Sequence, residues 1–232
     1  MVEAKFLSKR VVATVALLVV VACAVMTWRE SGYWKDGFSL YRRGIEVTSG
    51  NWLAHNNLGA MLNRRKMYPE AIKELEQAAA LAPDMGYVHY NLAIAYDRTG
   101  NTASARRHYR ETIRISPAAD DDYYAALSRT MWSEPDLPEA LDVLREGLRH
   151  FPSSSLLKGD EGYVLQKMGR LDDAIAAFRA ALQLEPGYME LYPLLYETLI
   201  RIGKPEEARD LYRQLQYRYP REAQGLLLDA DR

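Results

Sequence analysis

The chain has 232 residues, 48% hydrophobic and 26% charged, which is the composition of a folded protein and not of a disordered one. Its formal net charge is −1, with 30 basic and 31 acidic residues, so no overall field attracts nucleic acid. A disulfide within the chain is excluded because Cys23 is the only cysteine.

An uncharged apolar run occupies residues 11–28. As a helix it would span about 27 Å, close to the hydrocarbon core of a bilayer. Lys9 and Arg10 precede the run, and Trp28 ends it with an aromatic ring of the kind favoured at membrane interfaces. The pattern predicts a transmembrane signal anchor over residues 11–28, behind a cytoplasmic head of residues 1–10.

The charges on either side of the run favour an orientation. Lys9 and Arg10 lie directly against it, which favours an N-terminus inside the cell, and basic residues beyond the run weaken this bias. We therefore expect a single-pass protein of the inner (cytoplasmic) membrane with a periplasmic C-terminal domain. Two alternatives remain open: Ala22-Cys23-Ala24 is typical of a signal-peptide cleavage site, and Val20 to Cys23 resembles a lipobox that would lipidate Cys23.

Residues 29–51 form the predicted connection to the rest of the chain. Trp34, Leu40 and Ile45 recur at helical spacing, which predicts a solitary helix between Tyr33 and Val47. We expect this half-repeat to cap the first of the units that follow.

Five prolines divide the remaining sequence at intervals of 34, 35, 34 and 34 residues: Pro83, Pro117, Pro152, Pro186 and Pro220. A fixed period near 34 residues is typical of repeated helical hairpins. The register predicts five units over residues 52–220 and slightly beyond, with Asp120 as an extra residue and a short tail at 223–232. The units are 52–85, 86–119, 121–154, 155–188 and 189–222.

Across the units, large apolar residues recur at positions 7, 11 and 24 and small ones at positions 8, 20 and 27. In the first unit Leu58 and Leu75 are large, whereas Gly59, Ala71 and Ala78 are small. Positions 7, 8 and 11 share one face of a first helix, and positions 20, 24 and 27 share one face of a second. Small side chains let the two helices approach, and each proline ends the second helix.

These units resemble tetratricopeptide repeats from Trp52 to Pro220. The resemblance implies an all-α solenoid of five helical hairpins preceded by one transmembrane helix. Two departures stand out: Glu161 occupies an apolar position, where we expect a frayed helix or a paired carboxylate, and the run 133–136 changes the inner turn of the third unit.

The segment between the apolar run and the first unit is more specific. Tyr33-Trp34-Lys35-Asp36 and the run Asn51 to Gly59 resemble the junction in transmembrane O-mannosyltransferase-like proteins that carry C-terminal tetratricopeptide repeats. The resemblance implies repeats outside the cytoplasm. The catalytic residues of that family lie in its multi-span domain, so no catalytic role is carried over to this chain.

Residues able to support catalysis or metal binding are scattered. His55, His89, His108 and His150 lack ligand spacing, and Asp120 to Asp122 lacks the spacing of a calcium loop. The sequence contains no phosphate-binding glycine loop and no nucleophile motif. We therefore predict a non-enzymatic chain that binds neither cofactor nor metal.

The family resemblance implies that the first helix of each unit lines a concave groove. Aromatic and arginine side chains, which are favoured binding anchors, gather there in the first units. The chaperone-binding carboxylate clamp is not predicted, because Asn56 stands where that clamp has lysine. The candidate partner-binding residues are Asn56, Asn63, Arg64, Tyr87, Tyr90, Arg98, Arg129, Trp132, Tyr163 and Lys167.

The leading hypothesis is a membrane-anchored scaffold that binds a protein or peptide, such as a multi-span membrane protein, in this groove. One alternative is a detached repeat subunit of a membrane glycosyltransferase that acts in trans. Another is a lipoprotein pilotin or assembly factor.

Overall fold

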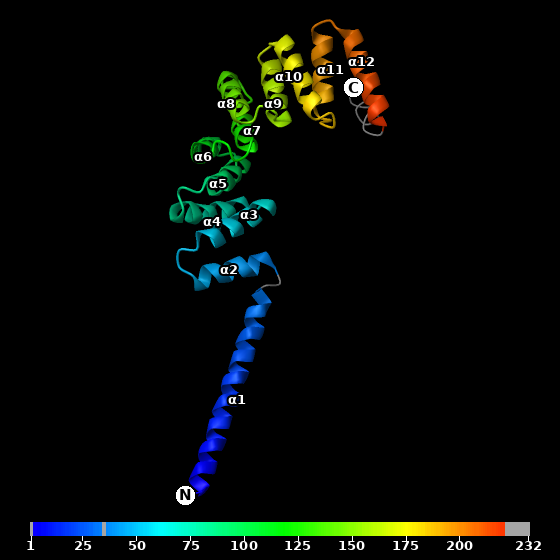
Figure 1. Ribbon diagram of the computed structural model, residues 1–232. Helices are drawn as coiled ribbons and strands as arrows, with labels where there is room; N and C mark the ends of the chain where they lie inside the picture. The colour runs from blue at the N-terminus through cyan, green and yellow to red at the C-terminus, as the bar shows by residue number, and fades with distance from the viewer. Residues whose placement is uncertain (1, 34–35, 221–232) are drawn as a thin grey trace. The chain divides into compact units, whose positions relative to one another are not determined.

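The computed structural model describes residues 2–33 and 36–220, and every regular element within those ranges is a helix (Figure 1). The predicted all-α class is therefore confirmed. The helices are α1 (Val2–Tyr33), α2 (Gly37–Val47), α3 (Trp52–Arg64), α4 (Tyr68–Leu81), α5 (Gly86–Arg98), α6 (Thr102–Ile115), α7 (Asp122–Arg129), α8 (Leu137–His150), α9 (Ser155–Lys167), α10 (Leu171–Leu184), α11 (Leu191–Arg201) and α12 (Pro205–Arg218).

The chain divides into two compact units between Pro83 and Asp84. The first unit holds α1 to α4. Within α1, the segment Val11–Trp28 is long and apolar enough to cross a membrane, and its side chains are exposed. The same length and composition fit a signal sequence, so the helix is compatible with either a membrane anchor or a signal sequence.

Helix α2 occupies the region predicted to hold a solitary helix. It begins after Asp36, whose carboxylate accepts a hydrogen bond from the Ser39 N–H at 2.9 Å, as an N-cap does. The guanidinium of Arg65 lies 4.0 Å from the centre of the Phe38 ring. The half-repeat thus contacts α3 and the turn between α3 and α4.

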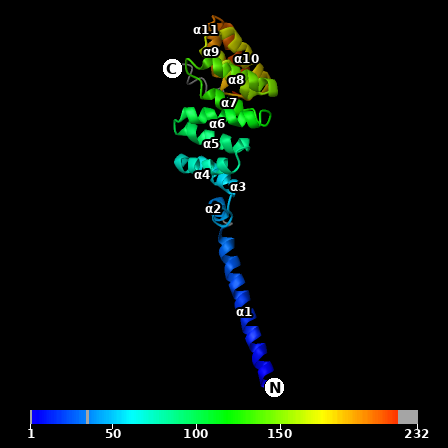
Figure 2. The ribbon, with the colours of Figure 1, turned by 90° about the vertical axis from the view of Figure 1, so that its left-hand side faces the viewer.

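The second unit contains α5 to α12, and Figures 1 and 2 both draw α5 beside α6 as an antiparallel hairpin. In both units the recurring prolines follow helix ends. Ala82, Ser116 and Phe151 each precede a proline, have φ between −126° and −139°, and cap a helix through their N–H. The residue before a proline avoids the helical conformation, so the proline period ends the second helix of each hairpin.

Helices α3, α5, α9 and α11 end in the same left-handed turn. Its central residue has a positive φ: Lys66 (60°), Gly100 (79°), Gly169 (75°) and Gly203 (78°). The N–H of the following residue bonds to the carbonyl five residues earlier, as Arg170 does to Leu165 at 2.9 Å. Helix α7 ends without this turn and has only eight residues, at the departure predicted for the third unit.

Small residues at the helix crossings explain the close packing within hairpins. Ala71, Ala105 and Ala174 are fully buried. A Cβ atom placed on Gly162 would lie 2.6 Å from two ring atoms of Phe178, closer than packed atoms approach. Position 8 of the fourth unit therefore needs glycine, because the Phe178 ring packs directly against it.

Glu161 keeps its place in an unbroken α9, so the expected fraying is wrong and the expected pairing is right. Arg145 on α8 lies 3.2 Å from its carboxylate. Arg110 with Glu139, and Arg179 with Glu207, form comparable pairs between neighbouring second helices of hairpins. The predicted tail at 223–232 and the last residues of the fifth unit lie outside the described residues.

Candidate functional site

The first helices of successive hairpins in the second unit, α5, α7, α9 and α11, carry the candidate site. Neighbouring helices contact each other in a regular register, in which a residue meets one 31 to 33 positions later. Tyr90 on α5 donates a hydrogen bond to the carboxylate of Asp122 on α7, and its ring lies 4.9 Å from that of Tyr123. Burial, followed by the bond to Asp122, raises the pKa of the Tyr90 hydroxyl, so it stays a neutral donor.

The same register brings Arg129 on α7 to Asp160 on α9. Arg129 Nη2 donates to Oδ1 of Asp160 at 3.2 Å, and its Nε lies 3.0 Å from Oδ2. The Asp160 side chain is only 7% exposed, whereas that of Arg129 is 40% exposed. Burial raises the pKa of the Asp160 carboxyl to about 6, although Arg129 opposes the change. The ion pair thus holds an exposed guanidinium over a buried carboxyl.

Beside this ion pair lies an aromatic pair. Trp132, in the loop after α7, is 4.3 Å from Tyr163 on α9 between ring centres. The guanidinium of Arg129 lies 5.8 Å from the Trp132 ring, and the ammonium of Lys167 lies 5.3 Å from the Tyr163 ring. We call Arg129, Trp132, Tyr163 and Lys167 the aromatic–cationic cluster.

One buried polar atom of the cluster, Nε1 of Trp132, has no hydrogen-bond partner among the described residues. Folded proteins satisfy nearly all such atoms, because each one left unpaired costs stability. Oδ2 of Asp160 accepts no hydrogen bond either, but the ion pair with Nε of Arg129 compensates its charge. The unpaired indole nitrogen marks the cluster as a place where stability is not optimised.

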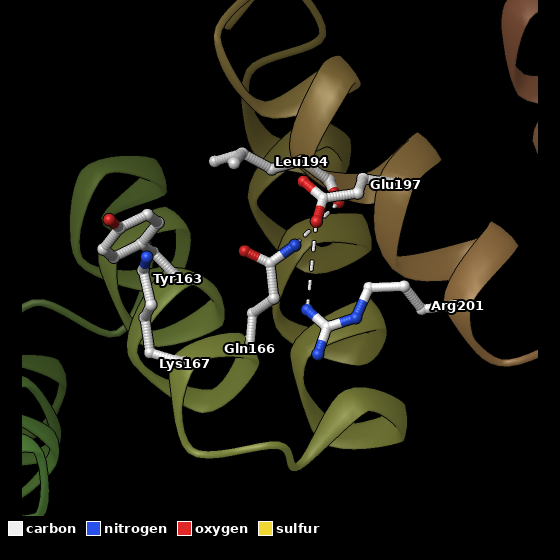
Figure 3. Close-up of a pocket in the computed structure, with 6 residues that line it drawn as sticks. All are labelled: Tyr163, Gln166, Lys167, Leu194, Glu197 and Arg201. Carbon is white, nitrogen blue, oxygen red and sulfur yellow. Dashed lines mark hydrogen bonds and ion pairs between the residues drawn. The ribbon is translucent and has the colours of Figure 1, made fainter.

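A hollow of about 250 Å³ opens between α9 and α11, next to Tyr163 and Lys167 (Figure 3). Gln166 forms part of its wall and is fixed in place, because its Nε2 donates to Thr198 Oγ1 at 2.8 Å. Arg201 lies 3.9 Å from Glu197 across the same wall. The remaining lining residue is Leu194.

Of the ten residues predicted from the sequence, four therefore come together as the aromatic–cationic cluster. Tyr90 lies on α5 in its own aromatic contacts, and Tyr87 and Arg98 are exposed on the same helix. The other three, Asn56, Asn63 and Arg64, belong to α3 in the first unit.

The structure places these three differently. Asn56 is 3% exposed, and its amide donates to Asn57 at 3.2 Å, so it belongs to the packing of α3. Asn63 is half-buried, and Arg64 is exposed. Asn56 is therefore not part of the proposed binding surface.

Sequence reasoning missed Asp160 and Leu194, because both hold position 6 of their units, which belongs neither to the expected packed face nor to the expected groove lining. The constant offset between residues that meet on neighbouring first helices could have indicated the pair of Arg129 and Asp160. Arg129 and Asp160 are 31 residues apart, as are Trp132 and Tyr163. A cation and a carboxylate at that separation in adjacent units were therefore candidates for a pair.

The histidines take part in local packing. His55 Nδ1 lies 2.8 Å from the Glu74 carboxylate, and His89 is buried and stacked on His108. Among the residues that the structure describes, no group of three or more histidine, cysteine or acidic side chains has the arrangement of a metal site.

Comparison with protein families identifies the class. Family models described as tetratricopeptide repeat match residues 52–118, residues 165–229, and residues 90–155 and 131–188. These matches cover the repeat region in succession. The chain therefore belongs to the tetratricopeptide repeat family, whose members are protein–protein interaction scaffolds.

Known relatives are distant. Human protein O-mannosyl-transferase TMTC3 is 22% identical over 197 residues, which covers 84% of this chain and 19% of that protein. Drosophila melanogaster Tmtc3 is 22% identical over 183 residues, 78% of this chain and 17% of that protein. The chain thus spans about a fifth of the length of these relatives. The predicted resemblance to the repeats of such proteins is confirmed at this low identity.

Solved structures support the fold. YrrB, described as a TPR protein with an unusual peptide-binding site, matches with a TM-score of 0.61 at 16% identity, over 80% of this chain and 96% of that one. A fragment of MamA from Desulfovibrio magneticus has a TM-score of 0.62 at 18% identity, over 78% of this chain and 94% of that one. At these identities the likeness concerns the fold alone.

Proposed function

We propose that the chain is a non-enzymatic, membrane-anchored scaffold that holds a peptide or partner protein on the helix face formed by α7, α9 and α11. The observation that carries the proposal is the Trp132–Tyr163 pair, with a cation beside each ring. Tryptophan, tyrosine and arginine are the residues that most often dominate binding energy at interfaces. The adjacent hollow would accept a side chain of the partner.

The indole Nε1 of Trp132, which is buried without a hydrogen-bond partner among the described residues, supports the same location. Selection for stability alone would remove such a group, so its presence favours a role in binding. The candidate residues Tyr90, Tyr87 and Arg98 on α5 would extend the contact surface within the second unit. In the first unit, described by itself, Asn63 and Arg64 on α3 stay candidate binding residues.

The anchor would be the apolar segment Val11–Trp28, with the N-terminus inside the cell and the repeats on the outer face of the inner membrane. Lys9 and Arg10 before the segment support this orientation. Protease added to spheroplasts should digest the repeats; full protection would contradict the orientation. Mass spectrometry of the protein purified from membranes should find an N-terminal peptide that includes residue 1. An N-terminus at Cys23 or later would show that the segment is a cleaved signal and not an anchor.

Affinity purification of the tagged full chain from membranes, followed by mass spectrometry, tests the binding function. The Trp132→Ala/Tyr163→Ala double variant should lose the partner, because each ring is a large contact surface. Tyr217→Ala is the matched control, since this tyrosine is 93% exposed on α12 and outside the cluster. Equal recovery of the partner by both variants, with unchanged helicity, would remove the cluster from the binding surface.

A second candidate function is a repeat subunit that supports a membrane glycosyltransferase in trans. The similarity to TMTC3 over 84% of this chain favours it. If it is right, a multi-span glycosyltransferase should dominate the purified partners, and deletion of this chain should abolish glycosylation by that enzyme. Full glycosylation in the deletion strain would reject this function and leave the scaffold proposal intact.

A further inference from the structure

The hollow between α9 and α11 has an uneven charge. Its wall carries Lys167, Arg201 and Glu197, which gives one net positive charge. Figure 3 shows the Lys167 ammonium beside the Tyr163 ring and the Arg201–Glu197 pair on the opposite side. The hollow therefore attracts an anionic group.

Among the charged side chains that line the hollow, Lys167 is the one whose hydrogen-bond donors are all available to a ligand. No ion pair within 4.0 Å joins its ammonium to a carboxylate of the described residues, and the ammonium lies 5.3 Å from the centre of the Tyr163 ring. By contrast, Arg129 is held by Asp160 at 3.0 Å, and Arg201 already lies near Glu197. An ammonium has three donors, which a carboxylate can accept in charge-assisted hydrogen bonds.

The wall beneath the ammonium is rigid and polar. Gln166 is 5% exposed, and its amide nitrogen is bound to Thr198 and to the Leu194 carbonyl. Its amide oxygen lies on the side of Tyr163 and Lys167 in Figure 3. That oxygen can accept a main-chain N–H from a ligand, while Leu194 and the Tyr163 ring offer apolar contacts on either side.

From these contacts we propose that the hollow binds the side-chain carboxylate of an aspartate or glutamate in an extended segment of the partner protein, with Lys167 as its main counter-charge. This inference rests on the proposed binding function and names the chemistry of the ligand. The acidic residue should lie within the ligand sequence and not at its C-terminus, because Leu194 and the Tyr163 ring offer apolar contacts on both sides of the ammonium. Ligand residues before and after the acidic one can then each make an apolar contact.

A specificity experiment tests the inference on the full chain in phospholipid nanodiscs. A naive library of dodecapeptides displayed on phage is selected on the parent chain, on Lys167→Ala and on Lys167→Glu. Lys73→Glu is the matched control, because Lys73 is exposed on α4 in the first unit. The parent chain and the control should enrich peptides with an acidic residue flanked by apolar or aromatic ones.

The Lys167→Ala variant should bind such a peptide about tenfold more weakly, the loss expected for one charge-assisted contact. The Lys167→Glu variant should select lysine or arginine at the same place in the peptide. Synthetic peptides with amidated and free C-termini should bind the parent chain equally, because the carboxylate is a side chain.

The outcomes separate the inference from the function on which it rests. Enrichment of peptides without an acidic bias, or with a bias that survives Lys167→Glu, overturns the carboxylate site and leaves peptide binding standing. Dependence on a free C-terminus also overturns it. Failure to enrich any peptide overturns peptide binding and the inference together.

Discussion

Replacing Asp160 by asparagine should stabilise the second unit at neutral pH. The carboxyl is 7% exposed, and its pKa is raised from 3.8 to about 6 by burial. Between these two pH values the folded chain binds more protons than the unfolded chain, so stability falls as pH rises through this window. The ionised carboxylate therefore lowers the free energy of unfolding by about 3 kcal/mol at pH 7.5 relative to a neutral side chain.

The Asp160→Asn variant keeps the shape of the side chain and removes the charge. Its partner Arg129 is 40% exposed, so water can solvate the guanidinium that loses its carboxylate. We expect a gain of up to about 3 kcal/mol at pH 7.5, which shrinks to about 1 kcal/mol at pH 4.5, where the native carboxyl is mostly protonated. The sign is opposite to that of an ordinary surface ion pair.

Urea unfolding of the full chain at the two pH values provides the measurement. Trp132 is the only tryptophan after residue 83, so its emission follows the second unit. Asp142→Asn is the control, because Asp142 is exposed on α8. If Asp160→Asn lowers stability at pH 7.5 by more than about 1 kcal/mol, the pair is net stabilising and the desolvation argument fails.

Three further predictions test the fold. Lys66→Gly should raise the free energy of unfolding of the first unit by about 0.5–1 kcal/mol, because φ is 60° there, whereas Arg65→Gly should lower it. Gly162→Ala should destabilise the second unit by about 1–2 kcal/mol through overlap with the Phe178 ring, and an unchanged urea midpoint would disprove the crossing argument. Glu161→Leu should stabilise the second unit by about 1 kcal/mol, since apolar burial replaces an ion pair worth less than that; a loss of stability would show that the pair matters more.

The helices were predictable because their signals are local. The residue before each proline must leave the helical conformation, and small residues at fixed positions permit close helix crossings. These constraints act within one hairpin, so the sequence of a single unit suffices to read them. The turn at Lys66 has the same place in its hairpin as the turns at Gly100, Gly169 and Gly203, although lysine stands where they have glycine.

The candidate site was only partly predictable, because it depends on register between hairpins. The family resemblance indicated Trp132 and Tyr163 separately, and their contact follows from the 31-residue offset between neighbouring first helices. Asp160 was missed because its role is to pair with Arg129, and this contact between neighbouring hairpins is visible only in the structure. The pairing of Glu161 with Arg145 likewise needed three-dimensional placement, since a local reading allowed either fraying or pairing.

Site-specific photo-crosslinking in native membranes can show whether a partner protein binds at the aromatic–cationic cluster. A benzophenone amino acid at position 163 would place the reactive ketone within the aromatic–cationic cluster, and the same amino acid at position 217 on α12 is the control. The account predicts a discrete crosslinked partner from position 163 that is absent from position 217 and disappears when Trp132 is replaced by alanine. Crosslinks to the same proteins from both positions, or none from position 163, would contradict it.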